Sequence, residues 1–129
     1  MSTKKIIFTD KAPAPIGPYN QAVLVNDTTL YTSGQIALHP QTMELVLDDI
    51  ETETKQVMEN MKAVLEAANM GFDNVVKTTI FIMDMNDFTR INTVYGSYFD
   101  EKTAPARETV QVACLPKNVN VEISMIAVK

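Results

Sequence analysis

Several residue types are scarce in this chain, and each scarcity limits what the protein can be. The single cysteine, Cys114, cannot form a disulfide within the chain, so nothing indicates an oxidising compartment. One cysteine and one histidine, His39, cannot build a closed Cys/His zinc site, and we expect no metal. No run approaches the roughly 18 apolar residues of a membrane span, and residues 6–8 are too short for a signal-peptide core. We therefore expect a cytoplasmic protein without a membrane partner.

Basic residues are also in the minority. The chain has 11 Lys and Arg against 16 Asp and Glu, which gives a net charge of −5. A basic stripe that could neutralise phosphates is missing, which argues against a nucleic-acid partner. The composition is otherwise typical of a globular protein, with 46% hydrophobic and 21% charged residues. The length of 129 residues predicts a single domain spanning residues 1–129.

Short strands and turns are predicted before residue 50. Residues 5–9 resemble a strand, and residues 21–25 and 29–33 resemble a hairpin joined by Asn26-Asp27-Thr28. Between the strand at residues 5–9 and the hairpin, residues 12–18 contain three prolines, which predict a rigid irregular segment. A short returning strand is predicted at residues 44–47.

Two amphipathic helices follow. The first is predicted over residues 50–70, with Asp48 and Glu51 spaced as a capping box and Gly71 as the stop. Its apolar residues recur at spacings of three and four, as one buried helix face requires. The second helix is predicted over residues 86–102, with a stripe of Phe88, Ile91, Tyr95, Tyr98 and Phe99.

Three further strands are predicted at residues 75–83, 107–113 and 120–128. The order of elements predicts an α+β two-layer domain, a largely antiparallel sheet with both helices on one face. The other face is expected to mix polar and apolar residues and to form a contact between subunits, where pockets commonly occur. Residues assigned to this second face are Arg107, Thr109, Gln111, Glu122, Ser124, Ile126 and Val128.

The usual catalytic motifs are missing: there is no phosphate-binding glycine loop, no nucleophile elbow and no metal-ligand cluster. His39 stands before Pro40 and is interpreted as a turn residue. The acidic run at residues 48–51 is interpreted as a helix start. Cys114 is interpreted as a small buried hydrophobic residue.

Arg107 and Glu122 remain as candidates for chemistry. If neighbouring strands carry them on one face, they form either a structural ion pair or a site in which Arg107 binds a carboxylate and Glu122 transfers protons. Gly34 is likewise open to two readings, a β-bulge or a close backbone contact with a ligand.

Six motifs, in order along nearly the whole chain, strongly resemble the RidA (YjgF/YER057c/UK114) family. They are Ile16-Gly17-Pro18-Tyr19, Thr32-Ser33-Gly34-Gln35-Ile36, Val76-Lys77-Thr78-Thr79, Asn86-Asp87-Phe88, Pro105-Ala106-Arg107, and Leu115-Pro116-Lys117 leading into Val121-Glu122-Ile123.

The resemblance implies a chorismate-mutase-like fold, assembled as a homotrimer with its sites between subunits. It also implies hydrolysis of enamine or imine intermediates, such as 2-iminobutanoate and 2-iminopropanoate, to 2-oxo acids and ammonia, without a cofactor or metal. By the motifs, Arg107 would hold the substrate carboxylate, Glu122 would act with a bound water, and the backbone carbonyl of Thr109 would place that water. The residues that would line the pocket are Tyr19, Ser33, Gly34 and Asn92.

Two positions depart from the family pattern: Thr109 stands where many members have cysteine, and Cys114 stands where arginine is common. Neither departure removes Arg107 or Glu122. A different class of function stays open, a trimeric module that binds small carboxylates in a regulatory role without turning them over. A ribonuclease or translation-inhibitor role, also attached to this family, is disfavoured by the acidic charge.

Overall fold

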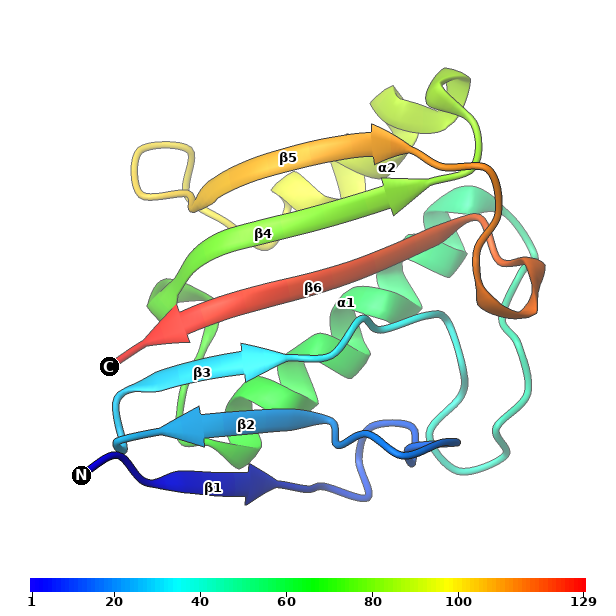
Figure 1. Cartoon of the computed structure of the whole chain (residues 1–129). Helices are drawn as coiled ribbons and strands as arrows, with labels where there is room; N and C mark the ends of the chain where they lie inside the picture. Colours follow the sequence, from blue (N-terminus) through cyan, green and yellow to red (C-terminus); the bar gives the residue numbers. More distant parts are fainter.

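The computed structural model, which describes residues 1–129, has one six-stranded sheet with two helices packed on one of its faces (Figure 1). The strands are β1 (Lys4–Ile7), β2 (Ala22–Val25), β3 (Thr29–Thr32), β4 (Val75–Ile82), β5 (Ala106–Gln111) and β6 (Val121–Val128). Their order across the sheet is β1-β2-β3-β6-β4-β5, and only β4 and β5 run parallel. The predicted α+β fold, mostly antiparallel with both helices on one side, is confirmed.

The β2–β3 hairpin forms as predicted. Asn26 and Asp27 have φ of 53° and 59°, the left-handed conformation of the two-residue turns that match the twist of a hairpin. The predicted strand at residues 44–47 is wrong, because that segment makes only a single bridge, between Leu45 and Leu38.

The first helix, α1 (Ile50–Ala67), is capped at its N-terminus by Asp49. The Asp49 carboxylate accepts a 2.7 Å hydrogen bond from the Thr52 amide, so the predicted cap at Asp48 was placed one residue too early. The helix ends before the predicted stop, because Asn69 takes the left-handed conformation (φ 58°) two residues ahead of Gly71. Its inner face packs into the core as predicted, through Val57, Met58, Met61, Val64 and Leu65.

The second helix, α2 (Phe88–Gly96), is shorter than predicted. After Gly96 the backbone tightens into i→i+3 hydrogen bonds, such as Tyr98 N to Tyr95 O at 3.1 Å. The Ser97 hydroxyl also donates to the carbonyl of Val94 at 2.6 Å, which favours a turn over a further helical step. Neither helix has the length and apolar composition that a membrane crossing requires.

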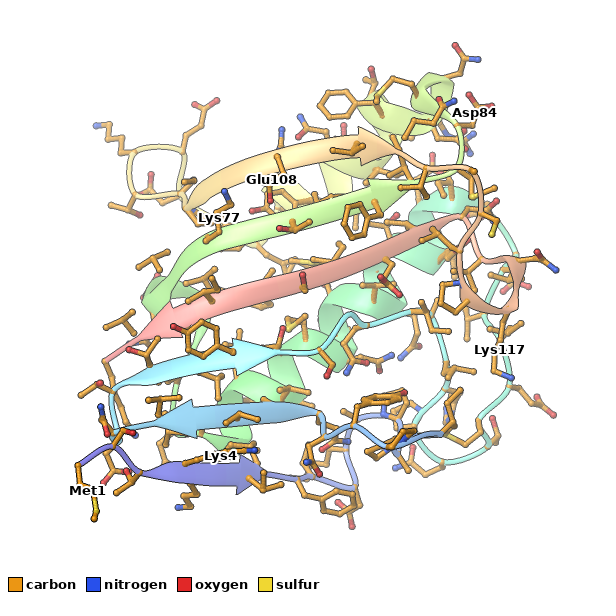
Figure 2. All side chains as sticks on the ribbon, in the orientation of Figure 1. Met1, Lys4, Lys77, Asp84, Glu108 and Lys117 are labelled. Atoms are coloured by element: carbon orange, nitrogen blue, oxygen red, sulfur yellow. The ribbon has the colours of Figure 1, made fainter.

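Strand register decides which side chains share a face of the sheet. Arg107 lies opposite Thr78 and Thr109 lies opposite Ile80, and both of these β4 partners are buried toward the helices. The prediction that Arg107, Thr109 and Gln111 share a face with Glu122 and Ser124 is therefore wrong. The open face of β5 carries Glu108, whose carboxylate pairs with Lys77 at 2.7 Å beside it on β4 (Figure 2).

The open face of the sheet is mixed, as predicted for β6. Glu122 and Ser124 face outward, while Val121, Ile123, Met125 and Ala127 face the helices and are buried. Ile6, Tyr31 and Val110 add exposed apolar side chains to the open face, on β1, β3 and β5. One face thus forms the core of the subunit, and the other leaves apolar surface in contact with solvent.

Candidate functional site

Four of the predicted site residues line one cavity of about 360 Å³, which we call the Glu122 pocket. The four are Tyr19, Ser33, Gly34 and Glu122, and they come from the segment before β2, the end of β3 and the start of β6. The rest of the wall is largely apolar and is formed by Pro13, Ala14, Ile16, Ile36, Leu38 and Pro116, together with Gln21 and Gln35.

A buried glutamine fixes the proline-rich wall of this pocket. The Gln21 side chain donates to the backbone carbonyls of Thr9, Ala12 and Pro13 at 2.9–3.3 Å and accepts from the Thr9 amide at 2.8 Å. These bonds satisfy polar groups of a segment that has no ladder partner of its own. Sequence reasoning missed Gln21, although a polar side chain directly before a buried strand was a usable signal.

A second part of the pocket wall, at Ile36 and Leu38, is held in place by a side chain of α1. The buried Asn60 amide donates to the carbonyls of Ile36 and Leu38 at 3.2 and 2.9 Å. The two apolar residues that face the pocket are therefore tied to the helix layer. The cavity is shaped before any ligand arrives, as is usual for small-molecule sites.

Glu122 is the only Asp, Glu, Lys, Arg or His side chain that lines the pocket. None of the three ion pairs in the chain includes it. Burial without a compensating cation raises the pKa of this carboxyl above its ordinary value. A carboxyl group with a raised pKa keeps its proton to a higher pH than an exposed one and can act as an acid or a base.

Gly34 makes room for that carboxyl group. A Cβ added at Gly34 would lie 2.7 Å from Glu122 Cδ, closer than real Cβ atoms come. The sequence left open a bulge or a ligand contact for this glycine, and the structure adds a third role, clearance for Glu122. Nearby, the Ser33 hydroxyl donates to the carbonyl of Asn20 at 2.6 Å, so its oxygen keeps lone pairs for a ligand.

Arg107 lies apart from this pocket, on the helix side of β5. Its guanidinium lies over the rings of Tyr95 and Phe88, with centroids at 5.1 and 5.6 Å, and donates to Asn92 Oδ1 at 2.6 Å. A second hollow of about 430 Å³, the Arg107 hollow, is lined by both Arg107 and Asn92. The contact with Asn92 leaves several guanidinium N–H groups without a partner, which suits them to bind a carboxylate.

The predicted proximity of Arg107 and Glu122 within one chain is wrong. Strand β4 lies between β5 and β6, and the two side chains point to opposite faces of the sheet. Arg107 takes part in none of the ion pairs either, so a structural salt bridge between the two residues is wrong as well. Thr109 accompanies Arg107 on the helix side, where its hydroxyl is buried without a hydrogen-bond partner.

The remaining candidates, His39 and Cys114, are explained by their local structure. His39 Nδ1 accepts from the amides of Gln41 and Thr42 at 3.2 and 3.4 Å, which confirms its role in a turn. Cys114 is exposed, so its predicted burial is wrong; its neighbour Leu115 is the residue that packs inward. No group of three or more potential metal-ligating side chains occurs in the chain.

Fold and site together define a class of protein: a two-layer α+β domain with an isolated acid on one side of its sheet and a stacked arginine on the other. A family model described as Endoribonuclease L-PSP matches residues 9–129. The chain belongs to this family, the RidA/YjgF family.

Named relatives align along almost the full length of the chain. A RutC family protein of Synechocystis is 58% identical over 127 residues, covering 98% of this chain and 97% of that protein. The mouse 2-iminobutanoate/2-iminopropanoate deaminase is 49% identical over 126 residues, covering 98% and 92%. Escherichia coli TdcF, solved with bound serine, superposes with a TM-score of 0.90 at 46% identity, covering 97% and 98%.

Proposed function

We propose that this protein hydrolyses reactive 2-imino acids, of the 2-iminobutanoate and 2-iminopropanoate type, to 2-oxo acids and ammonia without a cofactor. The observation that carries the proposal is Glu122, a half-buried carboxyl with a raised pKa and no cation from its own chain, in an otherwise uncharged pocket. A module that only bound carboxylates would have no use for an acid in that position. The name and 49% identity of the mouse relative support the same activity.

The proposed chemistry follows from these residue types. Arg107 holds the substrate carboxylate through paired N–H groups, which a planar guanidinium does better than an ammonium. The imine reacts in its protonated, iminium form. Glu122 takes a proton from a water as the water oxygen attacks the C=N carbon, which gives a neutral carbinolamine. Glu122 then gives that proton to the amine nitrogen. The C–N bond breaks as the carbinolamine hydroxyl loses its proton to the Glu122 carboxylate, which releases the 2-oxo acid and ammonia, and Glu122 passes the proton on to solvent. A positioned acid and base of this kind typically contributes about 10²–10⁴-fold to the rate.

Because one chain holds Glu122 and Arg107 on opposite faces of its sheet, the site needs a second copy. We therefore propose a homotrimer in which Arg107, Asn92 and Thr109 of one subunit face the Glu122 pocket of the next. The exposed Ile6, Tyr31 and Val110 on the open face support such an assembly, since apolar patches on a sheet favour contact between subunits.

A binding role without turnover is the second candidate, and the serine in the TdcF structure favours it. An amino acid carboxylate could occupy the same arginine site. The two functions differ in one measurement, release of 2-oxo acid. The ribonuclease activity in the family description receives no support from this chain, whose net charge is −5.

The direct test couples the purified protein to a dehydratase that releases the imine and follows the early rate of 2-oxo acid formation. Semicarbazide traps the free imine, so the protein should restore 2-oxo acid in competition with it. Equal rates with and without the protein would refute the enzymatic function and leave the binding role.

The shared site has its own test by subunit mixing. Glu122→Gln and Arg107→Ala chains are each expected to be nearly inactive alone. If each site takes Arg107 and Glu122 from different subunits, random co-assembly of equal amounts restores about one quarter of the sites. Mixtures that stay as inactive as the separate variants, with exchange confirmed by mass spectrometry, would refute a site shared between subunits.

A further inference from the structure

A buried carboxylate on α1, which the proposed reaction does not use, contacts the strand that carries Glu122. Glu53 is fully buried. Its Oε2 accepts from the Asn120 amide at 2.7 Å and from the Val121 amide at 3.3 Å, and its Oε1 accepts from Asn120 Nδ2 at 2.7 Å. Three donors from the start of β6 thus converge on one side chain of the helix layer.

These donors lie where the sheet offers no other partner. Along the same edge of β6, Ile123 donates to the carbonyl of Gln35 at 3.1 Å and Met125 donates to Thr32 Oγ1 at 2.9 Å. Strand β3 ends at Thr32, and the segment after it reaches only as far as the bridge between Gln35 and Ile123. The next donor along the edge, the Val121 amide, is left to Glu53.

A buried carboxylate without a cation is costly, and its three hydrogen bonds offset that cost. An apolar residue of similar size would fill the space but leave the buried backbone donors unsatisfied. The β6 backbone would then shift to find other partners. Glu122 directly follows Val121, so such a shift would move the Glu122 carboxyl, which has little clearance over Gly34.

We propose that Glu53 is a positioning residue, which sets the place of Glu122 by holding the two residues before it on β6. This inference rests on the proposed function for its kinetic consequence, although the contact itself does not. Glu53 touches neither the pocket nor a substrate, so it acts only through the backbone of residues 120–121.

The test compares Glu53→Met, Glu53→Gln and the matched control Thr54→Val. Thr54 is fully buried on the same helix turn, but its hydroxyl bonds only to the carbonyl of Ile50, so Thr54→Val removes a buried hydrogen bond without removing one to β6. Glu53→Met should lower kcat roughly 10- to 100-fold with KM changed by less than about threefold, because a displaced proton carrier slows the chemical step. Glu53→Gln should recover to within about threefold, because its oxygen can accept from the backbone amides while its nitrogen donates to a flipped Asn120 amide.

Assays belong well below the melting temperature of each variant, with assembly checked by light scattering. If Glu53→Met does not fold, Asn120→Ala removes only the side-chain donor and should lower kcat roughly threefold to tenfold. A Glu53→Met or Asn120→Ala protein with the kcat of the Thr54→Val control would overturn the proposal.

A readout that is independent of turnover separates this inference from the proposed function. The Glu122 carboxyl, followed by ¹³C NMR, should titrate at the same pH in wild type and Thr54→Val, and closer to an ordinary carboxyl in Glu53→Met. If the wild type hydrolyses no imine but the Glu122 midpoint still moves in Glu53→Met, the enzymatic function fails and the positioning role stands. An unchanged Glu122 midpoint in Glu53→Met overturns the positioning role whatever the activity.

Discussion

The Glu122 pocket and the Arg107 hollow are built in opposite ways. The pocket is a cavity with a mostly apolar wall, which Gln21 and Asn60 hold in place through hydrogen bonds to backbone carbonyls. The hollow lies at the sheet edge, where Arg107 is exposed and is held by a hydrogen bond to Asn92 and by two aromatic rings. The pocket desolvates its charged group, whereas the hollow leaves its charge hydrated and fixes its orientation.

That difference matches the roles proposed for Glu122 and Arg107. A proton carrier gains from partial burial, because desolvation moves its pKa toward neutral pH. A carboxylate-binding arginine gains from a fixed orientation, because its N–H groups must meet two oxygens at once. In this chain the two groups lie on opposite faces of the sheet, and the proposed trimer would bring them together.

The largest expected effect comes from Glu122→Gln, which keeps the shape of the side chain but removes the proton carrier. Turnover should fall roughly 10²–10⁴-fold, with modest change in the affinity for 2-oxo acids. Initial rates and calorimetric binding measure the two quantities. Unimpaired turnover would mean that the proton transfers occur elsewhere.

The same variant tests whether Glu122 is desolvated. Because burial raises its pKa, the folded state favours the protonated carboxyl, and this contribution to stability is lost as the pH rises through the raised pKa. Glu122→Gln should therefore melt at a higher temperature than wild type near about pH 7, and the gap should narrow toward about pH 4. A difference in melting temperature between Glu122→Gln and wild type that does not change with pH would argue against a raised pKa of Glu122.

The second effect concerns Arg107. Arg107→Ala should weaken binding of small 2-oxo acids by about 2–5 kcal/mol, which corresponds to roughly 30-fold or more in affinity. Arg107→Lys should be only a partial rescue, because it restores the charge but not the planar fork. Calorimetric affinity is compared with melting temperature for all three proteins. A variant that melts normally yet binds as tightly as wild type would exclude the role in carboxylate binding.

The third effect tests how tightly the Glu122 pocket fixes its carboxyl group, in contrast to the Arg107 hollow. Gly34→Ala places a methyl group where the Glu122 carboxyl now lies, so turnover should fall roughly 10- to 100-fold. Gly71→Ala is the matched control, because a Cβ there meets nothing within 4 Å. Equal rates for the two variants would show that the Glu122 carboxyl can move without loss.

The smallest effect is expected at Thr109. Thr109→Cys restores the residue common in the family, and the proposed contact there is with the backbone, so imine hydrolysis should stay within a few-fold of wild type. The Thr109 hydroxyl is buried and unpaired, so its replacement should not destabilise the fold. A large change in rate, with assembly intact, would show that the side chain itself contributes.

Much of the fold could be predicted because the patterns were local. The spacing of Val57, Met61 and Val64 defines the buried face of α1, and Asn26-Asp27 defines the hairpin turn. Four of the residues that line the pocket, Tyr19, Ser33, Gly34 and Glu122, were identified through motifs. These predictions needed no knowledge of which strands are neighbours.

The face of β5 could not be predicted in this way. Alternation separates Arg107 and Thr109 from Glu108 and Val110, but it does not say which set faces the helices. The burial pattern of β5 gives no answer either, because this edge strand is exposed along nearly all its length. The outcome depends on pairing with β4, a contact between segments about 30 residues apart.

The roles of individual polar residues were the second feature that could not be predicted from the sequence. Asp48 and Asp49 are both capable caps, and only the backbone path shows that Asp49 is the one used. Glu53 lies three residues after Ile50 and four before Val57, on the buried face of α1, but the sequence does not show which groups would pair with its carboxyl. Its partners, Asn120 and Val121, lie 67 and 68 residues further along the chain.

The position of β6 has a consequence for how the protein is made. This strand leaves the ribosome after the other five, yet it lies between β3 and β4 and joins them (Figure 1). Until it arrives, the β1–β3 meander and the β4–β5 pair have no shared ladder, and both expose unpaired backbone edges. Glu122 enters with β6, so the pocket is incomplete in a nascent chain until that strand has been translated.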